Sequence, residues 1–138
     1  MVEGPAKIDH TLFYRVIYGD TDKAGVVYYG TYMRLFEIGR TELLRERMGL
    51  PYSHLEERGI IFPVVELNCR YKAPARYDDL LEIWTCIQGC SKVSITFRYE
   101  IRRDGKLLVH GSTKHASVDL DGHLARLPQE LIQVIGSC

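Results

Sequence analysis

Residues 32–48 have the sequence YMRLFEIGRTELLRERM, and this segment decides the fold class. Its apolar residues recur at positions 32, 35, 36, 39 and 43, which is the spacing of one face of an amphipathic helix. We therefore predict a long helix over about residues 30–48, ended by Gly49, and a short second helix from Pro51 through Arg58. Gly39 lies on the apolar stripe, where the missing side chain lets a helix approach a sheet closely.

The segments on both sides of this helix have the patterns of β-strands. Residues 65–72 and 92–102 alternate between apolar and polar side chains, which predicts two strands with one covered face each. Residues 11–18, 80–88 and 107–120 complete a set of five strands, and Asp104-Gly105 predicts a hairpin turn. The side chains predicted to face the covered side of the two alternating strands are Val65, Leu67, Cys69, Tyr71, Val93, Ile95, Phe97, Tyr99 and Ile101.

One long helix among five strands indicates an α+β protein, with an antiparallel sheet wrapped around the helix. A length of 138 residues predicts one domain over residues 1–138, since single domains cluster near this size. Because one helix leaves the edges of such a sheet exposed, and unpaired edges pair with other chains, we also expect a homo-oligomer.

The charge balance and the motifs exclude several classes of function. Eighteen Lys and Arg balance eighteen Asp and Glu, so there is no basic excess for binding nucleic acid. The chain has no glycine-rich nucleotide motif, and its five scattered histidines lack metal-ligand spacing, so we expect no cofactor and no metal.

The same sequence predicts the cellular compartment of the chain. There is no secretory signal pattern at the N-terminus and no apolar run close to the roughly 18–20 residues that span a bilayer, so we expect no membrane insertion. Four cysteines without zinc-type spacing are expected to be free thiols, which is typical of a cytoplasmic protein.

The candidate site is the segment YGDTDKAGVVYYGTY, residues 18–32, which leads from the first strand into the long helix. The start of a helix offers unpaired backbone N–H groups and a partial positive charge, which can polarise a carbonyl. Asp20 or Asp22 on the preceding loop can face the same carbonyl carbon, and the two features together are the minimum set for acyl transfer. Considered on the residues alone, Asp-Thr-Asp is also typical of a loop in which the carboxylates bind nearby backbone N–H groups.

The pattern D-x-D-x-x-G-x-V-Y-x-x-x-Y at residues 20–32, followed by Glu37-x-x-Arg40, resembles the acyl-CoA thioesterases of the hotdog fold. The similar branch contains 4-hydroxybenzoyl-CoA thioesterase and the thioesterases associated with the Tol–Pal system. Residues 71–75 and 78–81 agree with that family as well. Many Tol–Pal members have His and Asn where this chain has Tyr29 and Thr31, so the sequence departs from that subgroup.

The resemblance implies hydrolysis of acyl-CoA, or of the same acyl group on an acyl carrier protein, without a cofactor. It implies that Asp22 acts as nucleophile or general base, that Asp20 is structural, and that the oxyanion contact is a backbone N–H near Tyr29. It also implies dimers, often paired again into tetramers, with the active site between subunits.

The expected contacts with substrate come from the motif for the acyl group and from basic residues elsewhere in the chain for coenzyme A. The residues predicted to line the acyl site are Gly25, Val26, Val27, Tyr28 and Tyr32, and those predicted to meet the phosphates of coenzyme A are Lys72 and Lys92, with Arg70, Arg76 and Arg98 as further candidates. The acyl group can be aromatic or aliphatic, because Tyr28, Tyr29, Tyr32 and Phe62 can line a pocket of either kind. Glu37 is a second candidate for the catalytic carboxylate, because another branch of hotdog thioesterases uses a glutamate on the long helix.

Two alternative functions use the same fold. One is an acyl-thioester dehydratase or hydratase, which usually needs a histidine on or just before the helix. The absence of histidine between Thr11 and Ser53 argues against it. The other is a binding module that holds an acyl thioester without turning it over.

Overall fold

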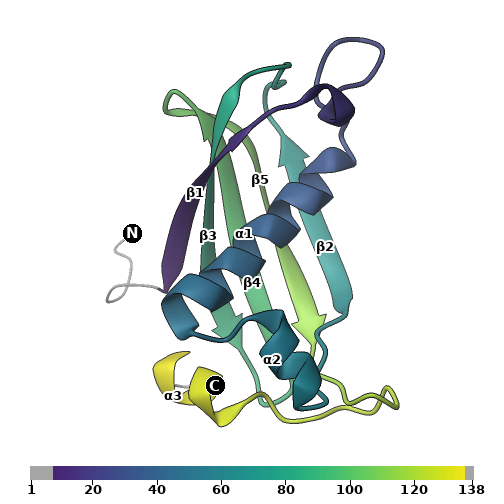
Figure 1. Cartoon of the computed structure of the whole chain (residues 1–138), viewed down its shortest axis with the longest axis vertical. Coiled ribbons are helices and arrows are strands. Elements are labelled where there is room, and N and C mark those ends of the chain that lie inside the picture. The colour runs from purple at the N-terminus through teal and green to yellow at the C-terminus, as the bar shows by residue number, and fades with distance from the viewer. Residues whose placement is uncertain (1–7, 136–138) are drawn as a thin grey trace.

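The computed structural model describes residues 8–135 of the chain. Five antiparallel strands form one sheet in the order β1-β3-β4-β5-β2 (Figure 1). The strands are β1 (Asp9–Arg15), β2 (Val64–Tyr71), β3 (Leu80–Cys90), β4 (Ser94–Arg103) and β5 (Lys106–Ala116). The predicted α+β architecture, a five-stranded antiparallel sheet with one long helix, is confirmed.

The long helix α1 (Thr31–Met48) lies diagonally across one face of the sheet (Figure 1). It begins within one residue of the predicted position and ends where Gly49 adopts a left-handed conformation with φ 64°. The side chains that it buries against the sheet are Tyr32, Leu35, Phe36, Leu43 and Leu44. From β4 they meet Ile95, Phe97, Tyr99 and Ile101, which all face the core as predicted.

The remaining short elements explain where the strand predictions differ from the structure. β1 ends at Arg15 because the chain turns into the short 3-10 helix η1 (Tyr18–Asp20). β5 ends at Ala116, and Val118 then forms isolated bridges with Ile61 and Leu124. The second helix, α2 (Tyr52–Glu57), forms as predicted, whereas α3 (Gln129–Ile135) was not predicted.

The edge strand β2 corrects a prediction about burial. Val65 and Leu67 were expected to face the covered side of the sheet, yet they are 55% and 50% exposed. Along the whole strand only Cys69 is partly buried. α1 packs mainly on β1, β3 and β4 and meets β2 at Tyr71, so Leu67 is left uncovered. Val65 also lies where the register of β2 with β5 shifts between Val64 and Glu66. An apolar face of β2 is therefore left uncovered within one chain.

Two expectations about the environment of the chain can be compared with the structure. Cys90 is disulfide-bonded, so the expectation that every cysteine is a free thiol is wrong for that residue, while Cys69 is free. Across residues 8–135, none of the helices combines the length and the apolar character that a membrane span requires.

Gly39 is the point of closest approach between α1 and the sheet. A Cβ atom there would lie 2.3 Å from the Thr85 hydroxyl oxygen and 3.2 Å from the Ile83 Cγ2. Both neighbours lie on β3 and are fully buried, so neither can move away freely. The close approach predicted from the apolar stripe is confirmed.

We predict that Gly39→Ala destabilises the chain although alanine is the better helix former. The helix gains about 1 kcal/mol, whereas overpacking a rigid core costs about 1–3 kcal/mol, so the expected net loss is up to about 2 kcal/mol. Urea denaturation measures the free energy of unfolding. Gly89→Ala is the matched control, because a Cβ there meets nothing within 4 Å.

A double variant identifies the cause of that loss. Thr85→Ala removes the hydroxyl that the new Cβ would meet, and this hydroxyl has no hydrogen-bond partner. In a double-mutant cycle, Gly39→Ala should therefore cost less in the Thr85→Ala background. A Gly39→Ala chain more stable than the parent would contradict the packing argument.

Candidate active site

Asp20 braces the loop that connects β1 to α1. Its carboxylate is 1% exposed and accepts hydrogen bonds from the Tyr14 hydroxyl (2.8 Å), from the backbone N–H of Ile17 (2.9 Å) and from Arg34. Its backbone carbonyl accepts the N–H of Tyr28 at 2.8 Å. A buried carboxylate with this set of donors holds the loop in one conformation, which favours the structural role predicted for Asp20.

Asp22 stands in a different environment two residues later. It is exposed, and its Oδ1 accepts the backbone N–H groups of Ala24 (2.9 Å) and Val26 (3.4 Å). Among residues 8–135, no hydrogen-bond donor contacts its other carboxylate oxygen. Gly25 completes the turn with φ 86°, a conformation that favours glycine. The turn therefore fixes the direction of the Asp22 carboxylate and leaves one oxygen available.

The start of α1 presents unpaired backbone N–H groups next to this loop. The carbonyls of Tyr28 and Tyr29 accept the N–H groups of Thr31 (2.9 Å) and Tyr32 (3.4 Å). The N–H groups of Tyr29 and Gly30 themselves have no acceptor within residues 8–135. The Tyr71 hydroxyl donates to the Tyr29 carbonyl at 3.1 Å and so orients this peptide. This contact, which ties β2 to the helix start, was not anticipated from the sequence.

A cavity of about 370 Å³ brings these features together, within the usual size of small-molecule sites. Its lining residues are Asp22, Val26, Val27, Tyr29, Tyr32, Tyr71, Lys72, Ala73 and Pro74. Six of the residues predicted for the site therefore line one cavity, and Gly25 and Tyr28 lie in the same loop without lining it. Tyr28 stacks obliquely on Tyr29, with ring centroids 4.5 Å apart, and is 46% exposed.

Lys92 does not lie with the other predicted residues. It sits in the turn between β3 and β4, where its carbonyl accepts the N–H of Leu127 at 2.9 Å. That turn follows the end of β3, whereas Leu80, at the start of β3, is next to the loop that carries Asp22. The eleven residues of β3 separate these two ends by about 33 Å. Contact between Lys92 and a ligand stays a prediction.

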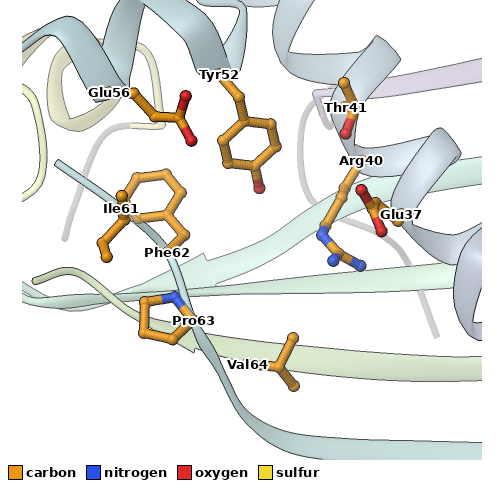
Figure 2. Close-up of a pocket in the computed structure, with 9 residues that line it drawn as sticks. All are labelled: Glu37, Arg40, Thr41, Tyr52, Glu56, Ile61, Phe62, Pro63 and Val64. Atoms are coloured by element: carbon orange, nitrogen blue, oxygen red, sulfur yellow. The ribbon is translucent and has the colours of Figure 1, made fainter.

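A second hollow, of about 520 Å³, lies between the middle of α1, α2 and the start of β2 (Figure 2). Figure 2 shows the Arg40 guanidinium and the Tyr52 hydroxyl pointing into it, and Glu37 lines this hollow rather than the cavity of Asp22. Burial raises the pKa of Tyr52 to about 12, so its hydroxyl keeps its proton at neutral pH. The sequence signalled this hollow only through the spacing of Glu37 and Arg40.

A buried polar chain lies behind the second hollow. The Tyr99 hydroxyl hydrogen-bonds the Thr113 hydroxyl at 2.6 Å, which hydrogen-bonds His115 Nε2 at 2.8 Å. His115 Nδ1 hydrogen-bonds the Phe62 carbonyl at 3.0 Å. Burial lowers the pKa of His115 to about 4, so the ring is neutral at neutral pH.

Comparison with known proteins agrees with this geometry. The profile of the thioesterase superfamily matches residues 24–110. Acyl-CoA thioesterase YbgC of Haemophilus influenzae is 38% identical over 77% of this chain and 78% of its own length. The solved DHNA-CoA thioesterase of Staphylococcus aureus has a TM-score of 0.83 and is 31% identical, covering 88% of this chain and 82% of that one.

A further solved structure is that of a 4-hydroxybenzoyl-CoA thioesterase mutant complexed with 4-hydroxybenzoyl-CoA. It is 26% identical, with a TM-score of 0.82, over 94% of this chain and 99% of that one. Sequence and structure thus agree over most of the length of the chain. The chain belongs to the thioesterase superfamily, whose solved members share its sheet and its single long helix.

Proposed function

We propose that this chain hydrolyses acyl-CoA thioesters, with Asp22 as the catalytic carboxylate and the backbone N–H of Tyr29 as the oxyanion donor. The observation that carries the proposal is that two residues line one cavity: Asp22, whose carboxylate is oriented by the turn, and Tyr29, whose backbone N–H has no acceptor among the described residues. A thioester carbonyl that accepts the N–H becomes more electrophilic at its carbon. The Asp22 carboxylate lines the same cavity and can act at that carbon.

The reaction joins the oxygen of water to the acyl carbon and breaks the bond from carbon to sulfur. The electron pair of that bond leaves with the sulfur of coenzyme A, which takes up a proton. Asp22 serves either as the base that removes a proton from water or as the nucleophile that forms an anhydride, which water then opens. In both routes the negative charge that develops on the carbonyl oxygen is stabilised at the start of α1.

The alternative hydratase or dehydratase chemistry has weaker support at this cavity. Such chemistry usually needs a histidine, and the described residues that line the cavity of Asp22 include none. Catalysis at Asp22 also accounts for the exposed carboxylate oxygen better than a binding module does, because binding an acyl thioester needs no free carboxylate. The relatives named above are thioesterases of acyl-CoA compounds, which supports hydrolysis here.

The substrate-binding part of the proposal concerns charge. Lys72 lines the cavity, and the Arg76 side chain lies close to Gly25, since a Cβ there would be 4.0 Å from its Nη1. We propose that Lys72, which lines the cavity, and Arg76, which lies beside the loop, meet the phosphates of coenzyme A. We also propose an acyl carrier protein that bears the same acyl group as a second substrate. That the reaction takes place in the cytoplasm stays a prediction.

We also propose that two copies pair along β2, antiparallel and edge to edge. The unpaired edge and the uncovered apolar face, with Val65 and Leu67, are features that another chain can satisfy together. The cavity of Asp22 lies at the end of β2, and the second hollow lies at its start. Antiparallel pairing therefore places the cavity of one copy beside the second hollow of the other, so the complete site lies between subunits.

We predict that Asp22→Asn lowers kcat by about 10²–10⁴, because the amide keeps the shape of the turn but is neither a base nor a nucleophile. The start of α1 still polarises the carbonyl, so a residual rate is expected. Release of free thiol from a panel of acyl-CoA thioesters measures the effect. Retention of more than about a tenth of the parent kcat would contradict the assignment.

The control for this variant is Asp20→Asn. Asp20 is buried and paired with Arg34, whereas Asp22 is exposed, so the two changes separate stability from chemistry. Asp20→Asn should lower the melting temperature more than Asp22→Asn does and reduce kcat less. Equal effects of the two changes on kcat would show that the loop, and not the Asp22 carboxylate, is what the reaction requires.

A third variant tests the pairing of copies. The parent should scatter light as a dimer, at twice the 15.9 kDa of one chain, or as a tetramer. Leu67→Lys should shift the mass toward one chain, because it places a charge on the apolar face of β2. Lys106→Glu, at an exposed position of β5, is the matched control and should leave the mass unchanged. A parent chain that is monomeric at micromolar concentration would contradict the proposal.

A further inference from the structure

Arg40 carries a charge that no other described group neutralises. Its Nη1 lies 3.4 Å from the Tyr99 hydroxyl, and the Tyr52 hydroxyl also hydrogen-bonds this side chain. Its Nε is buried and has no hydrogen-bond partner. Within residues 8–135, no carboxylate lies within ion-pair distance of the guanidinium, although Glu37 is three residues away on the same helix.

The two phenols do not supply the missing negative charge. Burial raises the pKa of Tyr52 and of Tyr99, so both hydroxyls are neutral at neutral pH. His115, at the far end of the buried chain, is neutral as well. A largely desolvated guanidinium without a counter-charge is energetically costly, and because its Nε is buried, only the end of the group that points into the hollow can meet an acceptor from outside. The side of Arg40 that faces the second hollow is where such an acceptor can enter (Figure 2).

The walls of the second hollow define what kind of acceptor fits. Ile61, Phe62, Pro63 and Val64 form an apolar side opposite Arg40 (Figure 2). The exposed carboxylates of Glu37 and Glu56 also line the hollow and repel a group with several negative charges, such as a phosphate chain. The matching ligand is an apolar body that ends in one acceptor oxygen.

We infer that the second hollow receives the far end of the acyl group and selects acyl groups that end in an acceptor oxygen, either a hydroxyl or a carboxylate. This inference rests on the proposed thioesterase function and on the antiparallel pairing of β2. In that arrangement the thioester lies at Asp22 of one copy, and the far end of the acyl group lies against Arg40 of the other. Arg40 and Tyr52 donate to the terminal oxygen, and the apolar wall holds the body of the acyl group.

The first test compares acyl-CoA thioesters of equal length that end in a methyl, a hydroxyl or a carboxylate group. The parent should have a kcat/KM for at least one oxygen-ended thioester about tenfold or more above that for the methyl-ended one, since a hydrogen bond to a charged donor is worth that much. The hydroxyl and carboxylate arms identify which oxygen is preferred. A parent that favours the methyl-ended thioester, or shows no preference, overturns the inference.

Variants then locate the preference at this hollow. Arg40→Met should bring the ratio of kcat/KM values to within about threefold of one, because the donor is lost while the length of the side chain is nearly kept. Arg45→Met is the matched control: Arg45 lies on the same helix but is exposed and pairs with Glu42, so the ratio should stay at the parent value. A preference that survives Arg40→Met overturns the inference.

A second variant tests the same hollow even if Arg40→Met fails to fold. Tyr52→Phe deletes one donor and keeps the contact between Arg40 and Tyr99, so the fold is preserved and the ratio should still fall by about threefold or more. An unchanged ratio in this variant overturns the inference that the second hollow selects the acyl group.

Binding measurements separate this inference from the proposed function. Calorimetric titration of the Asp22→Asn chain with the same thioesters reports discrimination without turnover. Hydrolysis of all three thioesters at equal rates, with equal binding, supports the thioesterase function and overturns the selection. Discrimination in binding without hydrolysis by the parent supports the selection and overturns the function.

Discussion

The width of one helix limits how much of this sheet can be covered. An α-helix with its side chains is about 10–12 Å across, whereas five strands at about 4.8 Å spacing span roughly 19 Å between the outer strand axes. α1 packs on β1, β3 and β4, and Gly39 brings it against Ile83 and Thr85 of β3. The deficit falls on β2, which is left with a free edge and an apolar face. The cavity of Asp22 and the second hollow both lie along this uncovered strip, at the two ends of β2.

Two aspartates two residues apart show how the surroundings divide their roles. Asp20 is buried and has donors from Tyr14, Ile17 and Arg34, so its charge is used to hold the loop. Asp22 is exposed and lines the cavity, and it accepts local N–H groups on one oxygen only, so its second oxygen has no donor among the described residues. The rigid first residue gives the second a fixed direction, which a carboxylate needs if it is to act on a bound carbonyl. The same loop fixes the start of α1, because the Asp20 carbonyl accepts the N–H of Tyr28. From β2, the Tyr71 hydroxyl donates to the Tyr29 carbonyl and fixes it from the other side.

The elements of the fold were predictable because their periodicities are strong over long segments. The helix over residues 30–48 and the buried side of β4 follow directly from spacing. The exposure of Val65 and Leu67 was not predictable, because alternation indicates which side chains share a face but not whether anything covers that face. Lys92 shows a similar limit: a basic residue in a turn is easy to find, but its distance from Asp22 depends on the length and direction of β3. The contact between Tyr71 and Tyr29 joins residues 42 positions apart and has no local signal.

The buried charges of this molecule also differ in how completely they are satisfied. The buried Asp20 of the loop is neutralised by Arg34, a partly exposed residue of α1, so this carboxylate needs nothing from outside. Arg40 contacts the neutral hydroxyls of Tyr52 and Tyr99, its buried Nε has no partner, and its guanidinium points into the second hollow. A group that served packing alone would be more stable as an apolar side chain of similar size, because it would avoid the cost of desolvating a charge. The guanidinium therefore makes physical sense at this position when its acceptor comes from outside the chain, and the second hollow, which Arg40 lines, gives such an acceptor a route to it.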